Sequence, residues 1–208
     1  MHDSINNNIK VFKERFLDAC SKSSRQVSDI SIIAVSKKKE NSIIRQVFTN
    51  GFKNFGENFA QELAQKSEDL KDLNIVWHFI GPFQSNKVNL VASSADWVHS
   101  IDRKKIISKL DSACKKNNKV MNVCIQINID NEDTKSGIHP DNLLEFSAFI
   151  KEHANLKLRG IMVLPKLSDD LAHNEKVMGK CFALHANLKL VNPDADILIM
   201  TTEILRNL

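Results

Sequence analysis

Three adjacent lysines, Lys37 to Lys39, directly follow a run of small and branched apolar residues at 32–35. A neutral lysine amine is a nucleophile, and it is the form that Schiff-base formation with an aldehyde requires. Alternate side chains of a strand share a face, so Ile33, Val35 and Lys37 should point the same way. An apolar wall and two nearby like charges would favour the neutral form of Lys37. Lys37 is therefore a candidate nucleophile, although adjacent lysines more commonly serve solubility on an exposed loop.

Other polar side chains that can contact a ligand fall at or just past the ends of strand-like runs: Asn58, His78, Asp102 and Asn128. The carboxyl ends of barrel strands are where barrel enzymes collect their chemistry. Two of these residues also have purely structural roles open to them. Asn58 can cap the helical pattern that follows it. His78 alternates with aromatic residues, so it can be a hydrogen-bonded core histidine.

Strand-like and helical patterns alternate along the chain, after a leading amphipathic helix expected at 4–22. The strand-like runs lie at 31–36, 52–56, 75–81, 96–101, 120–129, 156–165 and 196–201. Apolar residues at neighbouring positions, as at 32–35, are typical of parallel strands covered on both faces. Seven such repeats fit an open doubly wound sheet or a (β/α)8 barrel, and no glycine-rich nucleotide-binding loop supports the open sheet. We predict an α/β fold, a TIM-type barrel with a leading helix that lacks the eighth strand and its helix, as one domain over residues 1–208.

Composition excludes several classes of protein. The chain has 208 residues, 42% of them hydrophobic, and its net charge of +4 is scattered, which is too mild to predict nucleic-acid binding. No window approaches the about 18 consecutive apolar residues of a membrane helix. Four cysteines lie far apart without zinc-binding spacing, and the start lacks an apolar signal segment. We therefore expect a cytoplasmic, metal-free monomer.

Six stretches resemble the pyridoxal phosphate homeostasis proteins, which are relatives of the barrel domain of alanine racemase. They are AVSK at 34–37, FGENFAQE at 55–62, WHFIGPFQSNK at 77–87, SID at 100–102, QINIDNEDTKSG at 126–137 and LRGIMVLP at 158–165. The stretches occur in family order and span nearly the entire chain. The resemblance implies that Lys37 forms the internal aldimine with pyridoxal 5′-phosphate, and that Asn58, His78 and Met162 line the pocket around the ring. The alternative for Met162 is a purely structural role as a core residue.

The resemblance also implies a function. Such a protein holds pyridoxal phosphate without a reaction of its own, serves vitamin B6 homeostasis, and has pyridoxal phosphate and dependent apoenzymes as partners. A pyridoxal phosphate enzyme such as a racemase is the alternative, and it needs a second acid/base on the opposite face of the ring. The related alanine racemases use a tyrosine from an additional domain, whereas this chain contains no tyrosine.

The last residues, DILIMTTEILRNL, depart from the family pattern. Family members continue through a turn with glycine and serine and an eighth strand, and these segments hold the phosphate. Without them, the first and seventh strands are expected to expose unpaired edges. Thr201 and Thr202 can offer hydroxyls to a phosphate. A truncated product with impaired or no cofactor binding is therefore a further alternative.

Overall fold

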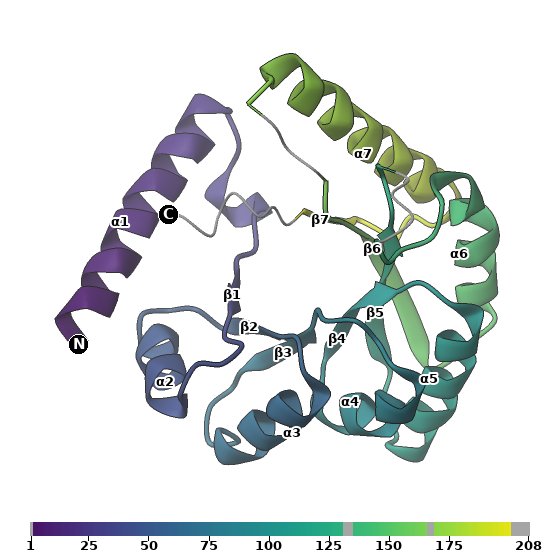
Figure 1. Ribbon diagram of the computed structural model, residues 1–208, viewed down its shortest axis with the longest axis horizontal. Helices are drawn as coiled ribbons and strands as arrows, with labels where there is room; N and C mark the ends of the chain where they lie inside the picture. Colours follow the sequence, from purple (N-terminus) through teal and green to yellow (C-terminus); the bar gives the residue numbers. More distant parts are fainter. Residues whose placement is uncertain (1, 131–134, 166–168, 201–208) are drawn as a thin grey trace.

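A parallel sheet forms the centre of the computed structural model, which describes residues 2–130, 135–165 and 169–200 (Figure 1). Within these residues the sheet has seven strands in chain order, each paired with its neighbours in sequence. They are β1 (Ile33–Val35), β2 (Asn54–Glu57), β3 (Val76–Phe79), β4 (Trp97–Ile101), β5 (Met121–Ile127), β6 (Leu156–Val163) and β7 (Ile197–Met200). Each strand overlaps one of the predicted runs, and every pairing is parallel. The predicted α/β barrel-type architecture is confirmed.

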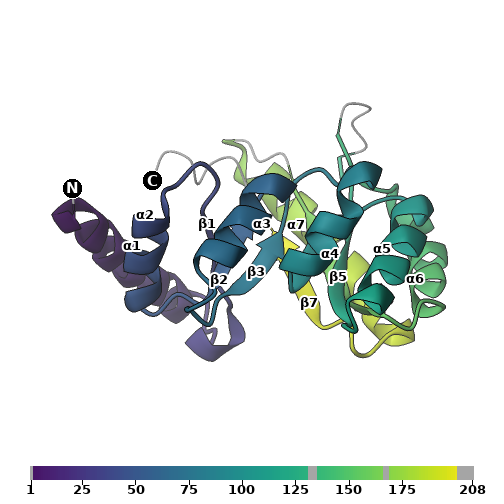
Figure 2. The same cartoon turned by 90° about the horizontal axis from the view of Figure 1, so that it is seen from below.

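Helices alternate with the strands and cover the outer face of the curled sheet (Figure 1). They are α1 (His2–Lys22), α2 (Asn41–Thr49), α3 (Ala60–Asp69), α4 (Val88–Ser94), α5 (Lys104–Lys116), α6 (Leu143–Lys151) and α7 (Leu171–Val191). Seen from below, α2 to α6 follow one another along this face in chain order (Figure 2). The predicted leading helix is confirmed as α1, which lies beside α2: the side-chain amide of Gln46 in α2 donates to Oδ1 of Asn6 at 3.0 Å.

The first strand is more exposed than its sequence suggests. Among the described residues β1 pairs with β2 alone and β7 with β6 alone, so the predicted open edges are present. Ile33 and Ala34 are half-buried, and 51% of Val35 is exposed. The expectation that this strand is covered on both faces is therefore wrong. An edge strand has a neighbour on one side only, and the sheet here does not close over it.

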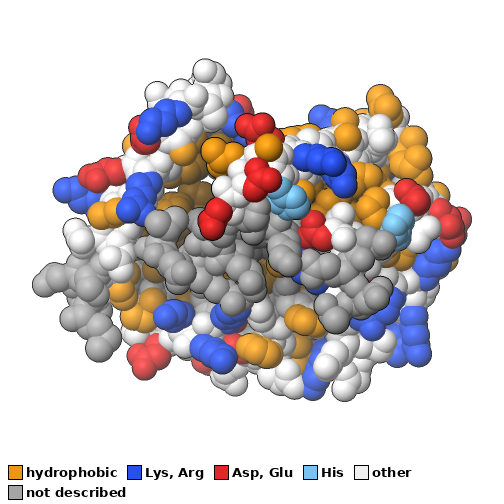
Figure 3. All heavy atoms as spheres, turned by 45° about the horizontal axis from the view of Figure 1, so that its top comes forward, with side chains coloured by type: hydrophobic (Ala, Val, Ile, Leu, Met, Phe, Trp, Pro, Cys, Tyr) orange, Lys and Arg blue, Asp and Glu red, His pale blue; other side chains and the backbone are white. Residues whose placement is uncertain are grey.

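Charges of both signs share the surface. On the face displayed in Figure 3, Lys and Arg side chains are interspersed with Asp, Glu and hydrophobic side chains. Across the described part of the chain, the helices are all too short or too polar to cross a membrane.

Candidate functional site

The polar residues singled out from the sequence follow the strands closely. Asn58, Asp102 and Asn128 come directly after β2, β4 and β5, and Lys37 is the second residue after β1. His78 is the exception, because it lies inside β3, one residue before its end. The carboxyl ends of these parallel strands form one rim of the sheet, so this rim is the candidate site.

Lys37 begins the turn that follows β1. Ser36 still pairs with β2, because its N–H donates to the carbonyl of Gly56 at 3.0 Å. If the alternation of the strand continues one residue further, the Lys37 side chain lies on the same face as Val35. Lys37 is half-buried, in surroundings wetter than the expected apolar wall because Val35 on the same face is exposed. Within the described residues its amine has no hydrogen-bond or ion-pair partner. This amine is therefore available to a ligand.

Asn58 directly follows β2, the strand that pairs with β1. Lys37 and Asn58 therefore both lie just past the carboxyl ends of two adjacent strands. Asn58 is half-buried. The alternative that Asn58 caps the next helix is wrong, because Phe59 occupies the N-cap position of α3.

The backbone of Asn58 is fixed by the close approach of Gly81, just beyond β3. A Cβ atom at Gly81 would lie 2.0 Å from the carbonyl oxygen of Asn58. Gly81→Ala is therefore expected to lower the free energy of unfolding by roughly 1–3 kcal/mol and to displace Asn58. Urea denaturation would measure this loss. Gly179→Ala is the control, because its Cβ would meet nothing within 4 Å and α7 should gain helix propensity; equal effects of the two substitutions would contradict the prediction.

His78 takes part in a buried hydrogen-bonded pair. Its Nδ1 lies 2.9 Å from Nε2 of His99, its Nε2 lies 3.0 Å from Oδ1 of Asn54, and its ring stacks on Trp97. Burial, together with the neighbouring His99, lowers the pKa of His78 to about 3, and burial lowers that of His99 to about 4. Both rings are therefore neutral near pH 7, and His78 has the hydrogen bonds of a core histidine below the rim.

Met162 lies on β6, three strands beyond His78 in the sheet, and is 3% exposed. Its strand neighbour in register is Gln126 of β5, whose amide donates to the carbonyl of Ser136 at 3.1 Å. The structure thus places Lys37 and Asn58 just past the carboxyl ends of two adjacent strands. It places Met162 on another part of the sheet and His78 one level lower.

Sequence reasoning missed a cluster directly behind Lys37. We call it the Lys66 cluster; it comprises Ser36, Glu57, Glu62 and Lys66, and joins β1 and β2 to α3. The i, i+4 spacing of Glu62 and Lys66 on one helix was the available sequence signal. That spacing usually marks a solvated pair, yet 7% of the Lys66 side chain and none of the Glu57 side chain are exposed.

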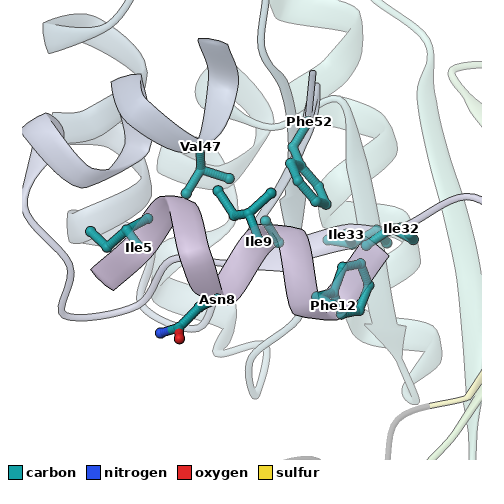
Figure 4. Close-up of a pocket in the computed structure, with 9 residues that line it drawn as sticks. Ile5, Asn8, Ile9, Phe12, Ile32, Ile33, Val47 and Phe52 are labelled. Carbon is teal, nitrogen blue, oxygen red and sulfur yellow. The ribbon is translucent and has the colours of Figure 1, made fainter. Parts of the chain in front are cut away.

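Two other regions bear on ligand binding. Thr201 and Thr202, the candidate phosphate contacts, lie outside the described residues. An apolar cavity of about 320 Å³ lies between α1, α2 and β1, with Ile9, Phe12 and Phe52 among its lining residues and Asn8 pointing away (Figure 4). Lys37 and Asn58 are not part of its lining.

Comparison with known sequences gives one family match and several relatives that share the same name. Residues 3–198 match the family described as alanine racemase, N-terminal domain. The pyridoxal phosphate homeostasis protein of Haemophilus influenzae is 37% identical over 93% of this chain and 83% of its own length. The protein of the same name from Escherichia coli K12 is 36% identical over 94% and 85%.

Solved structures share the fold. PipY of Synechococcus elongatus, in a structure with PLP bound, has a TM-score of 0.73 at 23% identity, covering 90% of this chain and 97% of PipY. Alanine racemase of Bacillus anthracis has a TM-score of 0.69 at 17% identity, covering 97% of this chain and 50% of the enzyme. At these identities the likeness concerns the fold alone. The sequence relatives go further: the chain belongs to the family of the pyridoxal phosphate homeostasis proteins, within the wider group that shares the alanine racemase N-terminal domain.

Proposed function

We propose that this protein binds pyridoxal 5′-phosphate through Lys37 and serves pyridoxal phosphate homeostasis without a reaction of its own. The observation that carries the proposal is that the half-buried Lys37, just past the carboxyl end of β1, has an amine without a hydrogen-bond or ion-pair partner among the described residues. The two sequence relatives named above are called pyridoxal phosphate homeostasis proteins, and PipY has a structure with PLP bound.

The residues present fit the aldehyde and ring of this cofactor. Pyridoxal phosphate supplies an aldehyde that condenses with a neutral primary amine, with loss of water. In the proposal Lys37 provides the amine, and Asn58 provides a polar side chain just past the end of the adjacent strand. The walls around the ring are Met162 and the carboxyl end of β3, the strand that carries His78.

The proposal extends to the setting of the protein. We place it in the cytoplasm as a single-domain monomer, with dependent apoenzymes as recipients of the cofactor. The four cysteines are all free and buried, which suits a reducing compartment. Light scattering of the purified chain tests the monomeric state.

The decisive experiment is covalent trapping. Added pyridoxal phosphate should give an absorbance band near about 420 nm that borohydride fixes onto the protein. Lys37→Ala is expected to lose the trapped cofactor completely, because it removes the proposed amine. Lys39→Ala, which removes an exposed lysine of the same turn, should retain it. Equal trapping on Lys37→Ala and the unchanged protein, with mass spectrometry locating the label elsewhere, would exclude Lys37 as the attachment site.

A further inference from the structure

The turn after β1 presents three lysines of equal intrinsic chemistry, so position must decide which one reacts. Lys37 is half-buried, whereas Lys38 and Lys39 are exposed. The turn is closed by the N–H of Lys39, which donates to the carbonyl of Ser36 at 3.0 Å. Lys38 has a φ of 59°, in the left-handed region that residues other than glycine rarely adopt. A backbone of this shape needs support from its surroundings.

Ser36 anchors the start of the turn through all of its polar groups. Its N–H donates to Gly56 of β2 at 3.0 Å, and its hydroxyl donates to Oε1 of Glu57 at 2.6 Å. Its carbonyl accepts from Nζ of Lys66 at 2.7 Å, in addition to the bond that closes the turn. Ser36 is 5% exposed, so solvent competes little for these bonds.

All three hydrogen-bond donors of the Lys66 ammonium group take part in this support. Its ammonium group has three donors, and three acceptors surround it: Ser36 O at 2.7 Å, Glu57 Oε1 at 2.8 Å and Glu62 Oε1 at 2.7 Å. These bonds use all three donors, and only 7% of the Lys66 side chain is exposed, so Lys66 does not compete for a ligand. Its bonds tie the turn to β2 and to α3 at once.

Glu62 completes the support at the strained residue. Its Oε1 accepts from the backbone N–H of Lys38 at 2.5 Å while also accepting from Lys66. The carboxylate therefore fixes the peptide that links Lys37 to Lys38. A shift of this peptide would reorient the Lys37 side chain, because the peptide carries its carbonyl.

We propose that the Lys66 cluster is a positioning device that selects Lys37, and not Lys38 or Lys39, as the amine offered to an aldehyde ligand. This inference rests on the proposed function above and adds residues that never touch the ligand. The cluster acts by holding the peptide between Lys37 and Lys38 in place, through the hydrogen bond from the N–H of Lys38 to Glu62.

The test compares two single-residue changes with opposite chemistry. Glu62→Gln removes the charge but keeps an acceptor oxygen at the same reach, whereas Glu62→Asp keeps the charge and withdraws the oxygen by one methylene. Each apoprotein is treated with pyridoxal phosphate and borohydride, and peptide mass spectrometry gives the ratio of label on Lys37 to label on Lys39. We expect Glu62→Gln to keep the ratio of the unchanged protein and Glu62→Asp to lower it by at least about tenfold, because small misplacements cost large factors in reactivity.

Trace acetylation without cofactor supplies a second readout. The ratio of Lys37 to Lys39 acetylation should fall in Glu62→Asp and stay unchanged in Glu62→Gln. Glu68→Gln is the matched control, since its carboxylate pairs with Lys71 on the exposed side of the same segment. An unchanged ratio in Glu62→Asp, or loss of selectivity in Glu62→Gln alone, would overturn the positioning role. Absence of label on Lys37 in the unchanged protein would instead overturn the proposed function, and with it this inference.

Discussion

Lys66→Met is expected to lower the free energy of unfolding by about 3–5 kcal/mol, because Glu57 would remain buried without its counter-charge. The Glu57 side chain is completely buried. Burial raises its pKa, against the opposing effects of its bonds to Lys66 and Ser36. Its second oxygen, Oε2, has no hydrogen-bond partner among the described residues. Lys66 is thus the main compensation for this charge, and urea denaturation near pH 7 measures its loss.

Two further variants decide whether the uncompensated charge is the cause. Adding Glu57→Gln to Lys66→Met removes that charge and should recover part of the lost stability, although Glu57→Gln alone also destabilises. Lys71→Met breaks an exposed ion pair with Glu68 and should cost less than about 1 kcal/mol. A loss in Lys66→Met as small as that in Lys71→Met would show that the buried pair does not stabilise the fold.

Acidification is expected to destabilise the protein through the buried pair of His78 and His99. Oδ1 of Asn54 accepts from Nε2–H of His78, so Nδ1 of His78 must accept from Nε2–H of His99. A further proton on His78 would set two N–H donors against each other. Burial lowers the pKa of His78 to about 3, with a further contribution from the neighbouring His99, and burial lowers the pKa of His99 to about 4, both well below the ordinary 6.5.

The direction of the pH effect follows from these pKa values. Between pH 6.5 and 4 the unfolded chain binds protons at both histidines that the folded protein does not bind, so the free energy of unfolding falls as the pH falls. From pH 7 to 4.5 the pair should account for a loss on the order of a few kcal/mol. His99→Gln should show a shallower loss over this range and the unchanged slope above pH 7. Identical slopes at acidic pH would contradict the assignment to this pair.

Periodicity predicted the architecture well because short, apolar strands alternate with helices from β1 to β7. It failed locally at β1, where Ile33 and Val35 have the composition of a doubly covered strand but lie at an open edge. Composition reports what a strand can bury, and neighbours in space decide what it does bury. The position of Lys37 just beyond β1 was predictable because it depends only on where an apolar run stops.

The partners of the candidate site were harder to predict. Asn58 could be placed by strand order alone, whereas the hydrogen bonds of His78 involve Asn54 and His99, which lie 24 and 21 positions away. The buried state of Lys66 was equally hidden, because its spacing from Glu62 is also that of a surface ion pair. The register between strands decides which distant residues meet, and a short stretch of sequence does not reveal that register.

The support of the Lys37 turn also has a consequence for the order of folding. Its three ties to side chains span 21, 24 and 30 positions, from Ser36 to Glu57, Lys38 to Glu62 and Ser36 to Lys66. Loops of this length cost little more entropy to close than much shorter ones, and near contacts favour rapid folding. All three ties lie within residues 36–66, so a nascent chain can shape the reactive turn once α3 has left the ribosome, before β6 and β7 have been synthesised.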